Sequence, residues 1–183
     1  MISKKQIPNV ITIGRGAMAL AIAGLFMSNL ENRFLIIFIL FLLASISDWL
    51  DGYLSRKWKV VSDFGKVFDP IFDKILTLIF YFFLFSVAGM PKLIFLLLFL
   101  REIFIDGLKN YMLAKGIVTP AIKSAKFKTF FQIAMIFFAL LFLIYPRFYW
   151  FQYLAYILGI IAVFLAYYSG WIYIKKWANQ RND

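Results

Sequence analysis

Cysteine and histidine are both absent from the 183 residues of this chain. The lack of cysteine excludes a disulfide scaffold, thiolate metal sites and cysteine catalysis, and the lack of histidine excludes the usual zinc sites and histidine-based catalytic triads. Acidic residues are scarce as well, since 9 Asp and Glu stand against 20 Lys and Arg, for a formal net charge of +11. A metal site in this chain would therefore use oxygen ligands, which suit hard ions.

Charged residues make up only 16% of the chain, whereas hydrophobic residues make up 63% and aromatic residues 21%. A typical globular chain is roughly 45–50% apolar and about 25% charged. One soluble core of this size could not bury so much apolar surface. The composition predicts an integral membrane protein, whose positive charge is explained by anionic lipid headgroups, with no nucleic-acid partner expected.

Six runs of mainly apolar residues are long enough to cross a hydrocarbon core about 30 Å thick. The runs are continuous rather than alternating, which predicts α-helices and not a β-barrel. We therefore predict an all-α integral membrane protein, a six-transmembrane-helix bundle that forms a single domain over residues 1–183. The predicted spans are approximately residues 7–27, 34–53, 67–88, 93–113, 127–145 and 150–174.

The distribution of cations predicts the orientation of the bundle. With the N-terminus inside, only Arg33, Lys92 and Arg147 fall in outer loops, whereas thirteen of the 20 cations fall in inner segments. The positive-inside rule then places both termini in the cytoplasm. We expect a multi-pass protein of a bacterial inner membrane rather than an organellar one, because the chain is short and shows no obvious transit peptide. A cleaved signal peptide is a weaker interpretation of the first 27 residues, because Arg15 interrupts the apolar run that such a signal needs.

Four aspartates lie within the predicted spans, where an ionisable group costs about 2.5–3.5 kcal/mol at a helix centre. Asp48 and Asp51 end the second span, and Asp69 and Asp73 begin the third. Spacings of three and four place each pair on one helix face, and the two helices are consecutive and antiparallel, joined by about a dozen residues. We expect the four carboxylates to meet near the cytoplasmic surface, where they would repel one another unless they bind protons or cations.

An all-oxygen cluster of this kind suits Mg²⁺ or Mn²⁺, and two ions fit four carboxylates. Two such ions can hold a diphosphate and stabilise in-line displacement at phosphorus. The alternative is that the aspartates form ion pairs that only hold helices together, for which four carboxylates in two phased pairs are more than is needed. The candidate partners for such pairs are Arg56, Lys66, Lys74 and Arg101.

The aspartates form part of a longer motif that closely resembles the signature of the CDP-alcohol phosphotransferase family. That signature is D-x2-D-G-x2-A-R-x8-G-x3-D-x3-D, and Ser55 in place of alanine is the one departure over residues 48–73. The matching residues are Asp48, Asp51, Gly52, Arg56, Gly65, Asp69 and Asp73. Further segments resemble the phosphatidylglycerophosphate synthases of that family: residues 7–12 with Arg15, Asp69-Pro70 with Asp73-Lys74, Arg101-Glu102, and residues 126–129 with Gln132.

The resemblance implies transfer of a phosphatidyl group from CDP-diacylglycerol to an alcohol, with release of CMP. It also implies that all four aspartates bind two metal ions, that Asp73 is in addition the catalytic general base, and that the enzyme is a possible homodimer. Gly52, Arg56 and Ser62 fall where family members contact the cytidine diphosphate group. Gly52 permits close approach to the backbone, and Arg56 suits phosphate oxygens.

A cluster of cations near the inner ends of the spans indicates the acceptor. Convergence of these residues on the aspartates would suit a phosphate-bearing alcohol such as glycerol 3-phosphate. The alternatives are lipid anchoring for the lysines and an internal ion pair between Arg101 and Glu102. The residues predicted to bind the acceptor phosphate are Arg15, Arg101, Lys109, Lys126 and Lys128.

Three positions depart from the family pattern: Phe72 replaces a customary alanine, Asp106 a small hydroxyl residue and Lys109 an arginine. The nearest rival function is a cardiolipin synthase of the same family, with phosphatidylglycerol as acceptor. A cation transporter would need charges near the midplane and a second, outward-facing polar path. A non-catalytic membrane scaffold would leave the aspartate cluster without a purpose.

Overall fold

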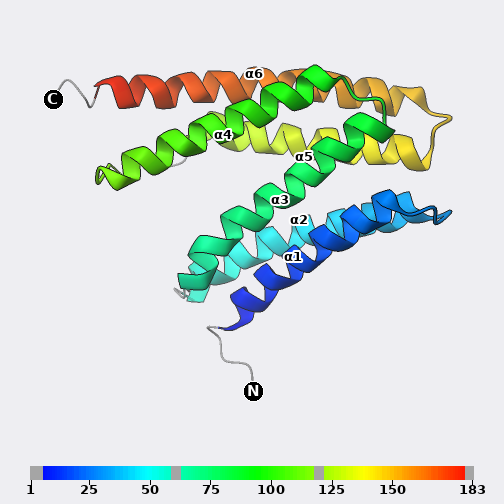
Figure 1. Ribbon diagram of the computed structural model, residues 1–183, viewed down its shortest axis with the longest axis horizontal. Helices are drawn as coiled ribbons and strands as arrows, with labels where there is room; N and C mark the ends of the chain where they lie inside the picture. Colours follow the sequence, from blue (N-terminus) through cyan, green and yellow to red (C-terminus); the bar gives the residue numbers. More distant parts are fainter. Residues whose placement is uncertain (1–5, 59–62, 118–121, 180–183) are drawn as a thin grey trace. The chain divides into compact units, whose positions relative to one another are not determined.

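The computed structural model describes residues 6–58, 63–117 and 122–179 (Figure 1). This part of the chain contains six helices and no strand, which confirms the predicted all-α class. The helices are α1 (Gln6–Met27), α2 (Arg33–Trp58), α3 (Asp63–Val87), α4 (Lys92–Ala114), α5 (Lys123–Ile144) and α6 (Tyr149–Asn179).

The helices match the six predicted spans but are longer at several ends. α2 continues to Trp58 and α3 begins at Asp63, where we had expected a connection of about a dozen residues between positions 53 and 67. α6 likewise extends past residue 174 to Asn179. The connection between α2 and α3 is therefore shorter than predicted. Hydropathy detects the stretch that suits lipid, whereas the backbone hydrogen bonds of a helix continue through polar side chains beyond it.

The structure supports a multi-pass membrane protein. Within the described residues, three stretches are long and apolar enough to cross a bilayer: Val10–Met27, Ser124–Ile144 and Tyr149–Asn179. α2 contains a shorter apolar stretch, Arg33–Ser47. Many large apolar side chains point outward on these helices, as expected for a surface covered by lipid.

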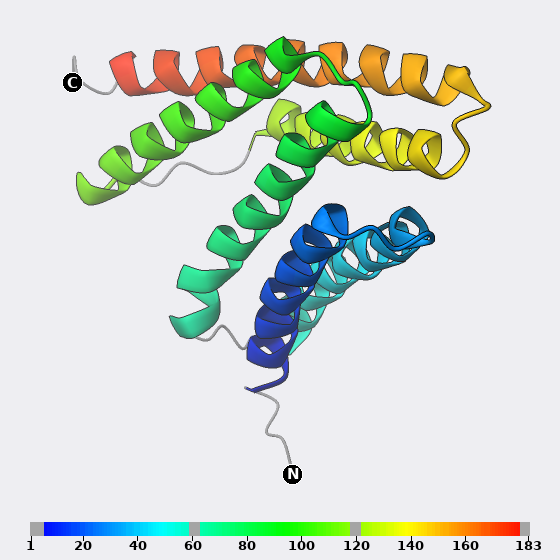
Figure 2. The ribbon, with the colours of Figure 1, turned by 45° about the vertical axis from the view of Figure 1, so that its right-hand side comes forward.

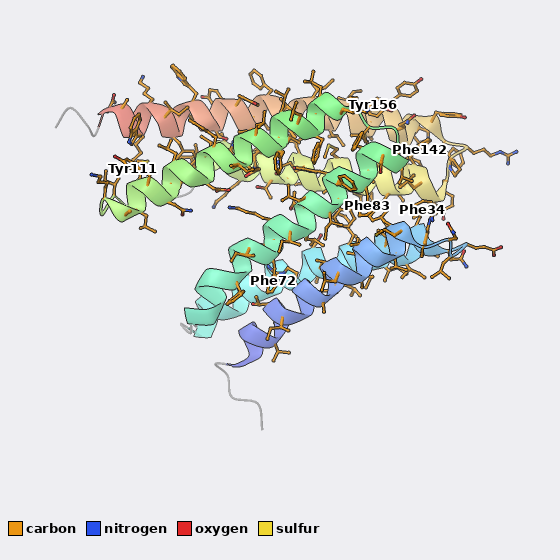
Figure 3. The ribbon with its side chains drawn as sticks, viewed as in Figure 1. Phe34, Phe72, Phe83, Tyr111, Phe142 and Tyr156 are labelled. Atoms are coloured by element: carbon orange, nitrogen blue, oxygen red, sulfur yellow. The ribbon has the colours of Figure 1, made fainter. Side chains whose placement is uncertain are left out.

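The chain forms two compact units, Met1–Phe83 and Leu84–Asp183. In the first unit α1 and α2 lie side by side, joined by a short turn (Figures 1 and 2). Phe26 of α1 centres its core, with its ring stacked on Phe83 at 4.6 Å and edge-on to Phe80 at 6.1 Å. The ring of Phe34 on α2 lies 6.5 Å from that of Phe26, centroid to centroid, so aromatic contacts join all three helices of this unit (Figure 3 labels Phe34 and Phe83).

In the second unit α6 packs against both α4 and α5. The buried face of α6 is built mainly from small residues, which allow close helix packing. A Cβ added to Gly159 would lie 3.0 Å from Sδ of Met135 on α5 and 3.1 Å from Cδ1 of Ile94 on α4. The small residues of that face are Ala155, Gly159, Ala162, Ala166, Ser169 and Gly170.

Side chains of α6 also hold the turn that precedes α4. Gln152 donates to the carbonyl of Ala88 at 2.8 Å, and Tyr156 donates to the carbonyl of Gly89 at the same distance (Figure 3 labels Tyr156). Gly89 has a φ of 65°, a left-handed conformation that favours glycine. The start of α4 is thereby fixed relative to α6.

Candidate functional site

The predicted metal-binding aspartates lie on helices, as their spacing indicated. Asp48 and Asp51 belong to the C-terminal part of α2, and Asp69 and Asp73 to the N-terminal part of α3. Asp73 is the one whose side chain is described. The side chains of Asp48, Asp51, Asp69 and Arg56, and the surroundings of Gly52, lie outside the described part, as does the whole of Ser62.

Asp73 is paired with Arg15, another predicted site residue. Nη1 of Arg15 on α1 donates to Oδ1 of Asp73 on α3. The Arg15 side chain is 1% exposed, whereas that of Asp73 is 45% exposed. Thr77, one turn along α3, donates from its hydroxyl to the backbone carbonyl of Asp73 at 2.9 Å. The structure therefore brings together one predicted acceptor-binding cation and the predicted catalytic base.

A glycine allows α1 to approach α3 at this pair. A Cβ on Gly16 would lie 2.7 Å from Cε1 of Phe72, so the ring occupies the space that any larger residue would need (Figure 3 labels Phe72). Phe72 departs from the family pattern, and its ring fits against α1 because Gly16 has no side chain. Sequence reasoning missed Gly16, although a glycine directly after an intramembrane arginine was a usable signal.

Arg101 is held against α6. It is 6% exposed, and it donates from Nε to the carbonyl of Ala166 at 2.9 Å and from Nη2 to Oγ of Ser169 at 2.8 Å. Its Nη1 also contacts Oε2 of Glu102 at 3.4 Å. The ion pair with Glu102 that we considered as an alternative role is therefore present, and the α6 contacts fix the plane of the guanidinium group.

Glu102 links α4 to α5. Its Oε1 accepts from Nζ of Lys128, and Nε2 of Gln132 lies 3.4 Å from the same oxygen. Lys128 and Gln132 are one turn apart on α5, and both are buried. From the sequence, Glu102 was considered only as an ion-pair partner of Arg101, and Gln132 was named in a motif without a role. The signal was an intramembrane carboxylate next to an arginine.

The remaining predicted cations of the second unit differ in their surroundings. Nζ of Lys109 lies 4.4 Å from the ring centroid of Tyr173, within the range of a cation–π interaction. Lys126 is exposed. Convergence of these cations with the aspartates of the first unit stays a prediction.

An apolar groove of about 560 Å³ lies between α4 and α6, next to the buried Arg101. Its walls include Phe104 of α4 and Tyr167 and Trp171 of α6. Arg101 is the charged residue that lines it, so the groove combines apolar walls with one cationic group.

Within the described side chains, no group of three acidic residues is close enough to hold a metal ion. The described member of the predicted ligand set, Asp73, has a partly exposed carboxylate that already has a guanidinium cation beside it. The carboxylate of Asp73 offers only oxygen donors, which are the ligands of a hard divalent ion such as Mg²⁺ or Mn²⁺.

Comparison with known proteins identifies the family. The model of the CDP-alcohol phosphatidyltransferase family matches residues 5–168, which include parts of all six helices. The chain belongs to this family. The resemblance indicated by the aspartate motif is therefore confirmed. In this CDP-alcohol phosphatidyltransferase the matching motif residues lie on α2 and α3.

Several bacterial relatives of this CDP-alcohol phosphatidyltransferase carry the name CDP-diacylglycerol–glycerol-3-phosphate 3-phosphatidyltransferase. The protein from Rickettsia typhi is 37% identical over 128 residues, which cover 70% of this chain and 72% of the relative. The protein from Cereibacter sphaeroides is 36% identical over 144 residues, 75% of this chain and 63% of the relative. The protein from Bacillus subtilis is 34% identical over 138 residues, 75% of this chain and 71% of the relative.

Proposed function

We propose that this enzyme transfers the phosphatidyl group of CDP-diacylglycerol to glycerol 3-phosphate, giving phosphatidylglycerol phosphate and CMP. The observation that carries the proposal is the shared name of relatives from distant bacteria, each 34–37% identical over 70–75% of the chain. The family match and the aspartate motif in α2 and α3 support the same reaction type.

The four motif aspartates, Asp48, Asp51, Asp69 and Asp73, are the proposed ligands of two Mg²⁺ or Mn²⁺ ions. Bound metal would neutralise the diphosphate and lower the pKa of the acceptor hydroxyl. Asp73 then accepts the hydroxyl proton. The acceptor oxygen forms a bond to the phosphatidyl phosphorus, and the bond from this phosphorus to the bridging oxygen breaks, so that CMP leaves with that oxygen. Gly52, Arg56 and Ser62 are the proposed contacts of the cytidine diphosphate group.

The proposed phosphate-binding cations are Arg15, Arg101, Lys109, Lys126 and Lys128. Arg101 suits this role because its hydrogen bonds to Ala166 and Ser169 fix the guanidinium group before a ligand arrives. A fixed guanidinium loses little side-chain entropy when it binds a phosphate group.

The lipid part of the reaction is supported by the groove between α4 and α6. An acyl chain is a ligand of matching chemistry, since the walls of the groove are apolar. We place the enzyme in a bacterial inner membrane, with six spans, both termini and the active site on the cytoplasmic side. A homodimer remains a family expectation.

The test is release of CMP by the purified enzyme in detergent with CDP-diacylglycerol, Mg²⁺ and a panel of acceptors. We expect release with glycerol 3-phosphate, loss of release after chelation of divalent metal, and recovery when Mg²⁺ or Mn²⁺ is returned. Release with phosphatidylglycerol alone would show a cardiolipin synthase instead. No release with glycerol 3-phosphate would overturn the proposed acceptor.

A further inference from the structure

One carboxylate in the second unit holds two cations, one on each oxygen. Oε1 of Glu102 accepts from the Lys128 ammonium, and Oε2 lies 3.4 Å from Nη1 of Arg101. Arg101 and Glu102 are neighbours on α4, whereas Lys128 comes from α5. Two cations brought together from different helices repel each other, so the carboxylate between them makes their approach favourable.

Both cations retain donors after these contacts. An ammonium group has three N–H donors, and among the described residues that of Lys128 donates to Glu102 alone. A guanidinium group has five, of which Arg101 directs one each to Ala166, Ser169 and Glu102. The donors that remain suit a ligand with several anionic oxygens.

We infer that Glu102 is a positioning residue, whose carboxylate holds Lys128 beside Arg101 so that both bind the phosphate of the acceptor alcohol. The inference rests on the proposed function, since it concerns the same reaction and acceptor. Glu102 itself touches no substrate. Gln132 supports it by placing its amide nitrogen 3.4 Å from the carboxylate oxygen that Lys128 also uses.

The test is the steady-state kinetics of Glu102→Gln, a change that removes the charge and keeps the size. We expect KM for glycerol 3-phosphate to rise about tenfold, the effect of losing roughly one hydrogen bond between charged groups. We expect a smaller change in kcat and an unchanged KM for CDP-diacylglycerol. Glu102→Asp, which keeps the charge, should recover part of the affinity.

Glu31→Gln is the matched control, since it removes the carboxylate of an exposed residue in the turn between α1 and α2. We expect it to leave both KM values unchanged. A lower melting temperature for Glu102→Gln with an unchanged KM for glycerol 3-phosphate would show a purely structural link and overturn the inference. If Glu102→Gln does not fold, Glu102→Asp is measured in its place. A raised KM for glycerol 3-phosphate then supports the inference, and an unchanged KM overturns it.

A double-variant comparison tests whether Glu102 acts through Lys128. In a Lys128→Met background, Glu102→Gln should cause no further rise in KM, because the group that it positions is already gone. If the double variant instead raises KM by the product of the two single-variant factors, the residues act independently and the inference is contradicted. Absence of CMP release by the unmodified enzyme with glycerol 3-phosphate would instead reject the proposed function, so the two failures are distinguishable.

Discussion

Among the side chains that the structure describes, the buried cations Arg15, Arg101 and Lys128 each pair with a carboxylate of their own unit. Arg15 pairs with Asp73 in the first unit, and Glu102 pairs with Arg101 and Lys128 in the second. Burying an unpaired charge in apolar surroundings costs free energy. A cation and a carboxylate that are buried as a pair offset much of this cost for each other. Ionisable residues within membrane spans are therefore treated as functional-site candidates.

Asp73→Asn should abolish most of the transferase activity. The change removes the proposed proton acceptor and a proposed metal ligand, and loss of a general base alone lowers a rate by about 10²–10⁴-fold. CMP release measures the effect, and the melting temperature in detergent reports whether the variant is folded. Thr77→Val, which deletes only the hydroxyl bonded to the Asp73 carbonyl, should keep most of the activity. Full activity of folded Asp73→Asn would remove Asp73 from the mechanism.

Helix packing in both units depends on positions where a side chain is small or absent. Gly16 lets α1 approach Phe72 of α3, and Gly159 lets α6 approach α4 and α5. The first of these contacts lies directly beside the Arg15–Asp73 pair, so the separation of α1 from α3 sets whether that pair can form. A residue with no chemistry of its own thereby affects the candidate site.

Gly16→Ala should destabilise the protein, because the new Cβ would lie 2.7 Å from the Phe72 ring. Overpacking of this kind costs about 1–3 kcal/mol, and Phe72→Ala in the same chain should relieve part of it. Gly14→Ala is the matched control, since a Cβ there meets nothing within 4 Å. Thermal unfolding in detergent compares the variants. Equal melting temperatures for the two alanine variants would show that the ring moves aside freely.

At the scale of the whole molecule, the absence of cysteine makes the proposed membrane orientation directly testable. Glu31→Cys lies in a predicted outer loop, and Lys115→Cys lies after α4 in a predicted inner one. In intact bacterial cells a membrane-impermeant thiol reagent should label Glu31→Cys, and it should label Lys115→Cys only after the membrane is opened. Labelling in the reverse order would invert the orientation and place the aspartates on the outer side.

The placement of the candidate site residues on helices was predictable because the signals for it are local in sequence. The aspartate spacing indicated helical pairs, and the structure places these residues on α2 and α3. The partners were not predictable in the same way. That Arg15 contacts Asp73, or that Glu102 contacts Lys128, depends on how α1 meets α3 and how α4 meets α5, and neither relation is written in local spacing.

The membrane class, the six helices and the family could be predicted from the amino-acid sequence, because hydropathy, helical period and motif spacing are properties of short stretches. Which charges neutralise one another, and which small residues permit close packing, depends on contacts between helices that are distant in the chain. Gly16 shows the reason: its effect comes from the Phe72 ring on another helix, and such a contact exists only after the helices have packed.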